Sequence, residues 1–216
     1  GGFYSSDYSK KYALDISLYN RFYNARGMNN LDVELSPRMR FSNKLFMVLS
    51  TALSRYLNNY GFVRVADTTY SGEIIIGKRN RWIVNNSIAA DYTFTNRMGL
   101  VLRLNHYWQE VHYLSFGELQ NDGWTTLSNY SGADASGKSL HNTSYNAFTI
   151  DMNFRWVVYP GSEISFVWKY NIYASKNALD LNYFNVFNDL FEQPQLNGFS
   201  VKALFFLDAG KLKRRN

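Results

Sequence analysis

The side chains best suited to acid–base chemistry in this chain are three histidines and the serines near one of them. His106 and His112 stand six residues apart in a segment with strand character, about 20 Å along a strand, so one metal ion cannot bind both. His141 lies in a polar segment near Ser139 and Ser144. A serine hydrolase also needs an acid that orients the histidine, and none stands at a suitable spacing. We therefore predict no catalytic residue, no metal site and no cofactor, and a hydrolase is the weakest hypothesis.

Paired carboxylates offer a second kind of chemistry. Asp32 and Glu34 would lie about 7 Å apart on one strand face, a conceivable glycosidase pair. Arg38 and Arg40 follow on the same face, which favours a network in which acids neutralise arginines. Similar charges recur on the polar faces of other segments, and we predict that they line a water-filled interior and set its selectivity. The predicted interior charges are Asp15, Asp32, Glu34, Arg38, Arg40, Asp91, Arg103, Asp151, Arg155, Lys169 and Lys202.

The segments that must position these charges alternate between apolar and polar residues. In residues 31–41, the odd positions are mostly apolar and the even positions carry Asp, Glu, Ser and Arg, a period of two that indicates a strand. Pro37 predicts a bulge or a local break there, because proline cannot donate to the ladder. The same reasoning predicts eight long strands, at 12–23, 31–41, 44–66, 73–94, 99–116, 147–159, 162–174 and 199–208.

The connections between these strands alternate in length. Short turns are expected at 42–43, 95–98 and 160–161, and longer loops at 67–72, 117–144 and 175–197, with a short helix near 183–191; the connection 24–28 is an exception, being short where a longer loop would be expected. Short turns at one end and long loops at the other are typical of outer-membrane barrels. Aromatic residues in the long loops could contact a ligand such as a sugar: Trp124, Tyr130, Tyr183 and Phe184.

Composition supports a membrane strand protein. Aromatic residues make up 18% of the chain, yet its mean hydropathy is −0.33, and no apolar run approaches the roughly 18 residues of a membrane-spanning helix. Tyr92, Phe94 and Trp156 stand near short turns, whereas Tyr107 and Trp108 stand toward the long loops. These two groups of aromatic residues would form two belts, which fit the two interfaces of a bilayer. We predict an all-β, antiparallel transmembrane β-barrel in contact with outer-membrane lipid; the alternative is a soluble lipocalin-like barrel or a sandwich.

The net charge is +6, but four of the positive charges stand in the last six residues. We therefore predict a solvated periplasmic tail at 209–216, not a nucleic-acid site. The chain begins Gly1-Gly2-Phe3, which is expected of a mature or cleaved piece. One domain is predicted over 1–216.

Several motifs of the chain resemble the C-terminal barrel of a family of bacterial outer-membrane proteins whose members carry an N-terminal carbohydrate-binding module of the family-nine type. The resemblance covers about residues 40–210. It rests on Gly77-Lys78-Arg79-Asn80, on Met98-Gly99-Leu100 with Arg103 and His106-Tyr107-Trp108, on Phe154-Arg155-Trp156 followed by Pro160-Gly161-Ser162-Glu163, and on Phe205-Phe206-Leu207-Asp208. The resemblance implies a larger barrel whose earlier strands lie on another segment, and it implies no settled activity.

The expected location follows from the loop lengths: bacterial outer membrane, with short turns and both termini in the periplasm and long loops outside. The first hypothesis is an uptake channel or surface-binding barrel, with glycans as candidate cargo. The second is a structural or partner-binding barrel within an outer-membrane complex. The expected partners are lipid, the missing N-terminal part of its own barrel and other outer-membrane proteins.

Overall fold

The computed structural model describes residues 1–207 except 64, 66–67, 71 and 180–181, and residues 208–216 lie outside the described part. The strands are β1 (Gly2–Ser5), β2 (Tyr12–Tyr23), β3 (Met28–Arg40), β4 (Leu45–Phe62), β5 (Ile75–Thr95), β6 (Met98–Leu119), β7 (Thr125–Leu127), β8 (Thr143–Tyr159), β9 (Ser162–Lys176) and β10 (Leu196–Leu204). The helices are the 3-10 turns η1 (Asn24–Arg26) and η2 (Thr68–Tyr70) and the α-helix α1 (Tyr183–Leu190).

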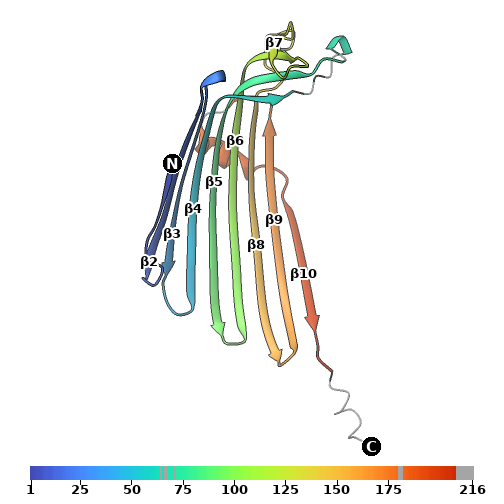
Figure 1. The fold of residues 1–216 in the computed structure, drawn as a ribbon. Coiled ribbons are helices and arrows are strands. Elements are labelled where there is room, and N and C mark those ends of the chain that lie inside the picture. The colour runs from blue at the N-terminus through green and yellow to red at the C-terminus, as the bar shows by residue number, and fades with distance from the viewer. Residues whose placement is uncertain (64, 66–67, 71, 180–181, 208–216) are drawn as a thin grey trace, which may run out of the picture.

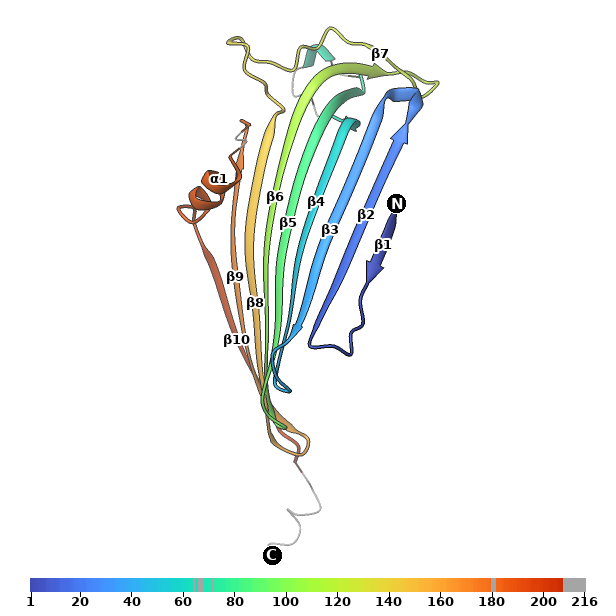
Figure 2. The same ribbon diagram turned by 90° about the vertical axis from the view of Figure 1, so that its left-hand side faces the viewer.

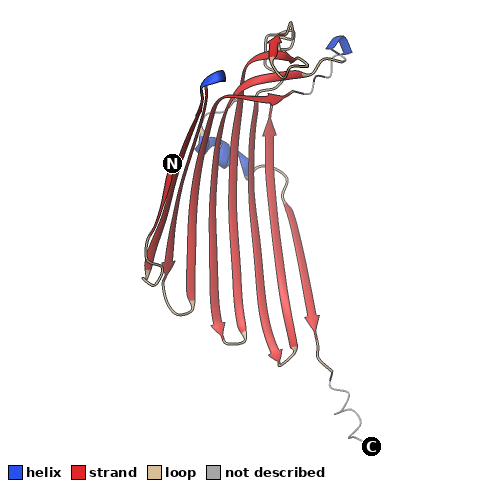
Figure 3. Cartoon of the chain, in the orientation of Figure 1, coloured by secondary structure: helices blue, strands red, loops and turns tan. Residues whose placement is uncertain are grey.

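All ten described strands belong to one antiparallel sheet (Figures 1 and 3). Its order is β1-β2-β3-β4-β5-β6-β8-β9-β10, with the short β7 paired to β6 alone. Every step in this order joins strands that follow one another along the chain, apart from the excursion through β7. The chain therefore forms an up-and-down meander, with short turns at one end and longer connections at the other.

The predicted strands agree closely with the observed ones. β2 has the predicted bounds, each of the other long strands overlaps its prediction, and α1 lies where a short helix was expected. Alternation did not reveal β1 and β7, which have four and three residues. No bulge forms at Pro37, which pairs with Leu14 of β2, and the β3–β4 register is the same on both sides of it. A local break is present on the β4 side, where the paired residues stop at Leu35 and resume at Arg38. The tail at 209–216, predicted to be periplasmic, lies outside the described residues.

The sheet is curved but it does not close on itself (Figure 2). β1 and β10 are its two edges, and every residue of β10 is exposed. The fold is therefore all-β and antiparallel, as predicted, whereas the closed barrel is not formed by the described residues alone.

The two faces of the sheet differ sharply in chemistry. One row of paired positions crosses all eight long strands and carries four charges: Ala13, Arg38, Val48, Ala89, Arg103, Asp151, Lys169 and Gly198. A row on the opposite face is apolar throughout: Leu45, Tyr92, Leu100, Phe154, Phe166 and Val201. Helix α1 packs on the apolar face, which is the convex one, and lies behind the sheet in Figure 1. The polar face is concave.

The apolar positions form a continuous band on the convex face. On β8 they run from Phe148 to Trp156, about 27 Å along the strand. The convex positions paired with them on β6 and β9 contain no Asp, Glu, Lys or Arg. None of the helices in the described part of the chain is long and apolar enough to span a membrane.

A small core lies between α1 and the sheet. Leu190 of α1 is fully buried against Ile172 and Tyr170 of β9, with Phe148 and Trp168 packed around them. The Asn182 side chain accepts a hydrogen bond from the backbone of Asn185 and so caps the N-terminus of α1. The remainder of the sheet is a single layer, so most of its side chains are only half-buried or exposed.

Candidate functional site

The eleven charged residues predicted to line an interior all lie on the concave face. In each strand they occupy alternate residues, and the pairing of the strands places these residues on the same side of the sheet. Two of the predicted bases pair with predicted acids. Arg38 Nε lies 2.8 Å from Asp15 Oδ2, and Lys169 Nζ lies 3.4 Å from Asp151 Oδ1. Arg155 pairs instead with Glu163 at 2.6 Å, an acid that the sequence prediction omitted.

The two closely spaced carboxylates are held by hydroxyl groups. Asp32 accepts hydrogen bonds from Ser54 Oγ at 2.6 Å and from Tyr56 OH at 2.9 Å. Glu34 accepts from Ser50 Oγ at 2.8 Å and from Ser36 Oγ at 2.9 Å. Their predicted neutralisation by arginine is therefore wrong, because β4 and β3 itself present hydroxyl groups at these levels.

At the long-loop end, the sheet bends over its concave face. Figure 2 shows the upper parts of β5, β6 and β7 turned over this side. Asn58, in β4, has a positive φ of 53°, and the pairing of β4 with β5 shifts register there. Its backbone N–H donates to Asn80 Oδ1 at 2.9 Å and its Nδ2 donates to the Gly27 carbonyl at 2.8 Å. These bonds fix the bend and tie it to the β2–β3 turn.

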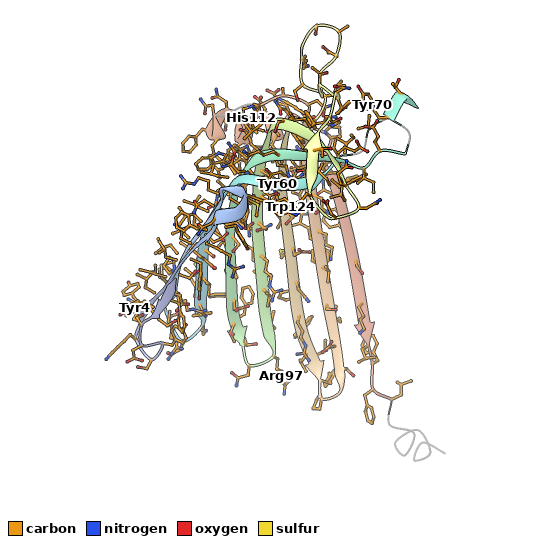
Figure 4. All side chains as sticks on the ribbon, turned by 45° about the horizontal axis from the view of Figure 1, so that its top comes forward. Tyr4, Tyr60, Tyr70, Arg97, His112 and Trp124 are labelled. Carbon is orange, nitrogen blue, oxygen red and sulfur yellow. The ribbon has the colours of Figure 1, made fainter. Side chains whose placement is uncertain are left out.

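A second tie crosses the concave face at this end. The guanidinium of Arg26, in η1, lies 5.1 Å from the Tyr60 ring and 5.4 Å from the Trp124 ring, within the range of cation–π attraction. Arg26 Nη2 also donates to the Gly123 carbonyl at 3.3 Å. Figure 4 shows Tyr60 and Trp124 close together near β7, with Arg97 at the far end of the sheet. The β2–β3 turn is thus joined to the segment between β6 and β7.

Two further arginines of β5 lie at the same end of the sheet, on the face opposite Tyr60, which pairs with Lys78. The Arg79 guanidinium lies over the Tyr113 ring at 5.6 Å, and its Nη1 donates to Tyr113 OH at 2.9 Å. The Arg81 guanidinium lies over the Tyr56 ring at 5.5 Å. Neither arginine lies within ion-pair distance of a carboxylate of the described residues. We call Arg26, Tyr60, Arg79, Arg81, Tyr113 and Trp124 the mouth cluster.

Next to the mouth cluster, the loop before β8 packs as an aromatic group. Tyr130 contacts the rings of Tyr70, Phe116 and His141, and its hydroxyl lies 2.5 Å from His141 Nε2. Burial lowers the pKa of His141. Ser139 Oγ accepts a hydrogen bond from the backbone N–H of His141 at 3.3 Å, and not from its imidazole ring. Among the described residues, no group of three or more potential ligands could hold a metal ion.

The four loop aromatics predicted to contact a ligand lie on opposite faces of the sheet. Trp124 and Tyr130 lie at the concave mouth, whereas Tyr183 and Phe184 belong to α1 on the convex face. The Tyr183 hydroxyl bonds to His106 Nδ1 at 2.8 Å and receives a hydrogen bond from Asn86 Nδ2 at 2.8 Å. Phe184 is 74% exposed. The four residues do not form one site.

The profile of one protein family, described as a domain of unknown function (DUF5916), matches residues 1–216. The chain belongs to this family. No curated protein and no solved structure matches it. The family description assigns no activity, so the function of this DUF5916 chain has to be inferred from the geometry of its sheet.

Sequence reasoning missed most of the mouth cluster. Arg79 stood within the motif Gly77-Lys78-Arg79-Asn80 but was assigned to barrel building, and Arg26, Tyr60, Arg81 and Tyr113 were not selected. The signal that could have found them is the mixture of arginine and tyrosine at the long-loop ends of β4, β5 and β6. Residues that meet through a bend in the sheet have no fixed spacing in the sequence.

Proposed function

We propose that this chain forms part of the wall of a β-barrel in the bacterial outer membrane, and that its concave face serves the uptake or surface binding of solutes. One observation carries the proposal: long strands with a charge-free apolar convex band and a charged concave face. Apolar positions facing lipid and polar positions facing an interior are the pattern of such barrels. The glycan cargo implied by the resemblance stays a prediction.

The proposed orientation follows from the two ends of the sheet. The short turns at 42–43, 96–97 and 160–161 would lie in the periplasm, and the mouth cluster and α1 would lie on the outer side. β10 ends at the short-turn end, so its C-terminal end would be periplasmic. β1 runs toward the same end from Gly2, which pairs with Leu18 midway along β2, so the N-terminal end would not lie in the periplasm as the sequence led us to expect. Exposed aromatic residues at this end would meet the inner interface, as Phe41, Phe94, Trp156 and Tyr159 are all at least 39% exposed.

Closure of this barrel would require further strands. The main order contains nine antiparallel strands, so the edge strands β1 and β10 run in the same direction. Bacterial outer-membrane barrels contain an even number of antiparallel strands, and a direct β1–β10 pair would be parallel. β1 also covers β2 from Asp15 to Leu18. An odd number of added strands, from another part of the same protein or from a partner, would satisfy both edges.

The unpaired edges also favour the second candidate function, a scaffold within an outer-membrane complex. An exposed strand edge offers a row of backbone donors and acceptors to a partner strand. β10 presents such an edge with all nine residues exposed. In this alternative, the concave face would be filled or plugged and would not conduct.

Heat-modifiability of the full-length protein in detergent tests the barrel. An unboiled sample that migrates differently from a boiled one supports a closed barrel, whereas identical migration, with protease access to β8, contradicts it. Conductance in a planar bilayer then separates the two functions. Stable single-channel steps support uptake, and a folded, inserted protein without conductance supports the scaffold.

A further inference from the structure

The convex face changes its chemistry at one row of paired residues near the long-loop end. This row crosses β2 to β6, β8 and β9 and includes three charged residues: Asn20, Leu31, Arg55, Trp82, Glu110, Ser144 and Lys176. Between this row and the short turns, no convex position of the eight long strands, all of which the structure describes, carries Asp, Glu, Lys or Arg. The row is therefore the outer limit of the apolar band.

Arg55 differs from the other two charged residues of this row. Glu110 is enclosed, at 2% exposure, and Lys176 Nζ lies 3.2 Å from Asp189 Oδ2 of α1. Arg55 is only half-buried, and no carboxylate of the described residues lies within ion-pair distance of it. Its guanidinium remains charged at all ordinary pH values. The row thus presents one positive charge that the described part of the protein does not neutralise directly, at the edge of the apolar band.

Neighbouring side chains hold the Arg55 guanidinium at this level. Its Cζ lies 5.8 Å from the centroid of the Trp82 ring, and its Nη2 donates to Asn29 Oδ1 at 3.3 Å. Asn29 Nδ2 in turn donates to Asn20 Oδ1 at 2.6 Å, which orients the Asn29 amide. The Arg55 Nε–H is buried without a hydrogen-bond partner, so the remaining Nη N–H groups are those left for another acceptor.

The position of Arg55 along β4 matches the thickness of a bilayer. Arg55 stands ten residues beyond Leu45, the first residue of β4, which is about 33 Å along the strand. At a tilt of about 35–45°, this length corresponds to a height of about 25 Å, which is the height of the apolar band in outer-membrane barrels. Arg55 would therefore lie at the outer interface of the membrane, at the level of the lipid headgroups.

We propose that Arg55, with the Trp82 ring beside it, binds the phosphate of an anionic lipid in the outer leaflet. Two oxygens of a phosphate match the fork of a guanidinium, and the acyl chains would lie along the apolar band toward the short turns. The Trp82 ring is 46% exposed and is of the amphipathic kind that lies at membrane interfaces. This inference rests on the proposed function, because it requires the convex face to meet the bilayer.

Native mass spectrometry of the full-length protein in detergent tests the site with two probes: diphosphorylated lipid A, and diacylglycerol, which has acyl chains but no phosphate. We expect lipid A to bind at least tenfold more tightly than diacylglycerol. The variant R55Q should weaken lipid A binding by about tenfold, the effect of removing one charged hydrogen-bonding partner, and should leave diacylglycerol binding unchanged. The variant R55K keeps the charge but loses the fork, and should weaken lipid A binding less.

Arg81 of β5 provides the matched control. The pair Tyr56–Arg81 directly follows the pair Arg55–Trp82 along the β4–β5 ladder, so the same kind of contact recurs on the opposite face, with the Arg81 guanidinium 5.5 Å from the Tyr56 ring. The variant R81Q should bind lipid A as the wild type does. Equal affinity for the two probes, or a loss in R81Q equal to that in R55Q, would overturn the inference.

The same samples separate this inference from the proposed barrel. A protein that shifts on boiling but binds lipid A no better than diacylglycerol overturns the lipid site and leaves the barrel intact. A protein whose lipid A binding depends on Arg55 but that shows no heat shift supports the site and contradicts the barrel.

Discussion

The convex and concave faces are built by the same eight long strands, yet the segment that packs over each face is held in a different way. On the convex face, α1 is held by burial, with Leu190 at 0% and Ile172 at 1% exposure. On the concave face, the segment around β7 is held by the Arg26 tie to Tyr60 and Trp124, and Trp124 itself stays 56% exposed. The convex cover is a packed layer, whereas the concave cover leaves charged groups within reach of solution.

The largest expected effect comes from placing charge on the convex band. We expect A90K/M152K, which puts two lysines in the middle of this band, to cost about 4–8 kcal/mol of membrane insertion, about 2–4 kcal/mol for each lysine at the bilayer midplane. The measurement is the fraction of protein that is heat-modifiable and protected from protease in liposomes.

The matched control is S87K/N153K, which places two lysines at similar levels on the concave face. Insertion should stay close to that of the wild type, because these side chains would meet water. Equal loss in both variants would show that the two faces do not differ in environment and would remove the main support for the barrel.

The packing of α1 should give the next largest effect. Leu190→Ala removes a fully buried side chain, and we expect a loss of about 2–5 kcal/mol in the free energy of unfolding. Urea denaturation in detergent, followed by tryptophan fluorescence, measures it. Phe184→Ala, on the exposed side of the same helix, should change stability by less than about 0.5 kcal/mol; a loss as large as that of L190A would mean that α1 packs through its other side.

The tie across the concave face should be weaker. Arg26→Ala removes two cation–π contacts and one hydrogen bond at a half-exposed position, and we expect a cost of about 1–2 kcal/mol. Hydrogen exchange at residues 120–127 should accelerate, while exchange in α1 should not change. Unchanged exchange at 120–127 would show that the tie does not hold this segment.

The smallest expected effect is a pH dependence of the aromatic loop. Burial lowers the pKa of His141, so the folded loop binds a proton less readily than the unfolded chain does. This contribution to stability is present above the usual histidine pKa of 6.5 and diminishes as the pH falls below it. Hydrogen exchange of the 128–142 segment, corrected for intrinsic rates, should be faster at pH 5.5 than at pH 7.5, and His141→Gln should abolish that difference.

The sequence predicted the strands well because alternation is a local property. The faces of β2 and β3 could be assigned residue by residue, and the eleven predicted interior charges do share one face. Local pattern could not identify β1 and β7, which are too short for a periodic signal and are defined by their pairing partners. It also assigned the wrong partners to Asp32 and Glu34, because three of the four hydroxyls that bind them belong to β4 and do not appear in the pattern of β3.

The sequence by itself determined the elements, their faces and the lengths of the connections, since a period of two and turn residues act over a few positions. Only the tertiary structure decided that Arg26 meets Trp124, that Tyr183 lies on the convex face, and that the described sheet stays open. These features depend on curvature, on register across several strands and on the bend at Asn58. Such properties arise from contacts between residues far apart in the chain, and no local pattern encodes them.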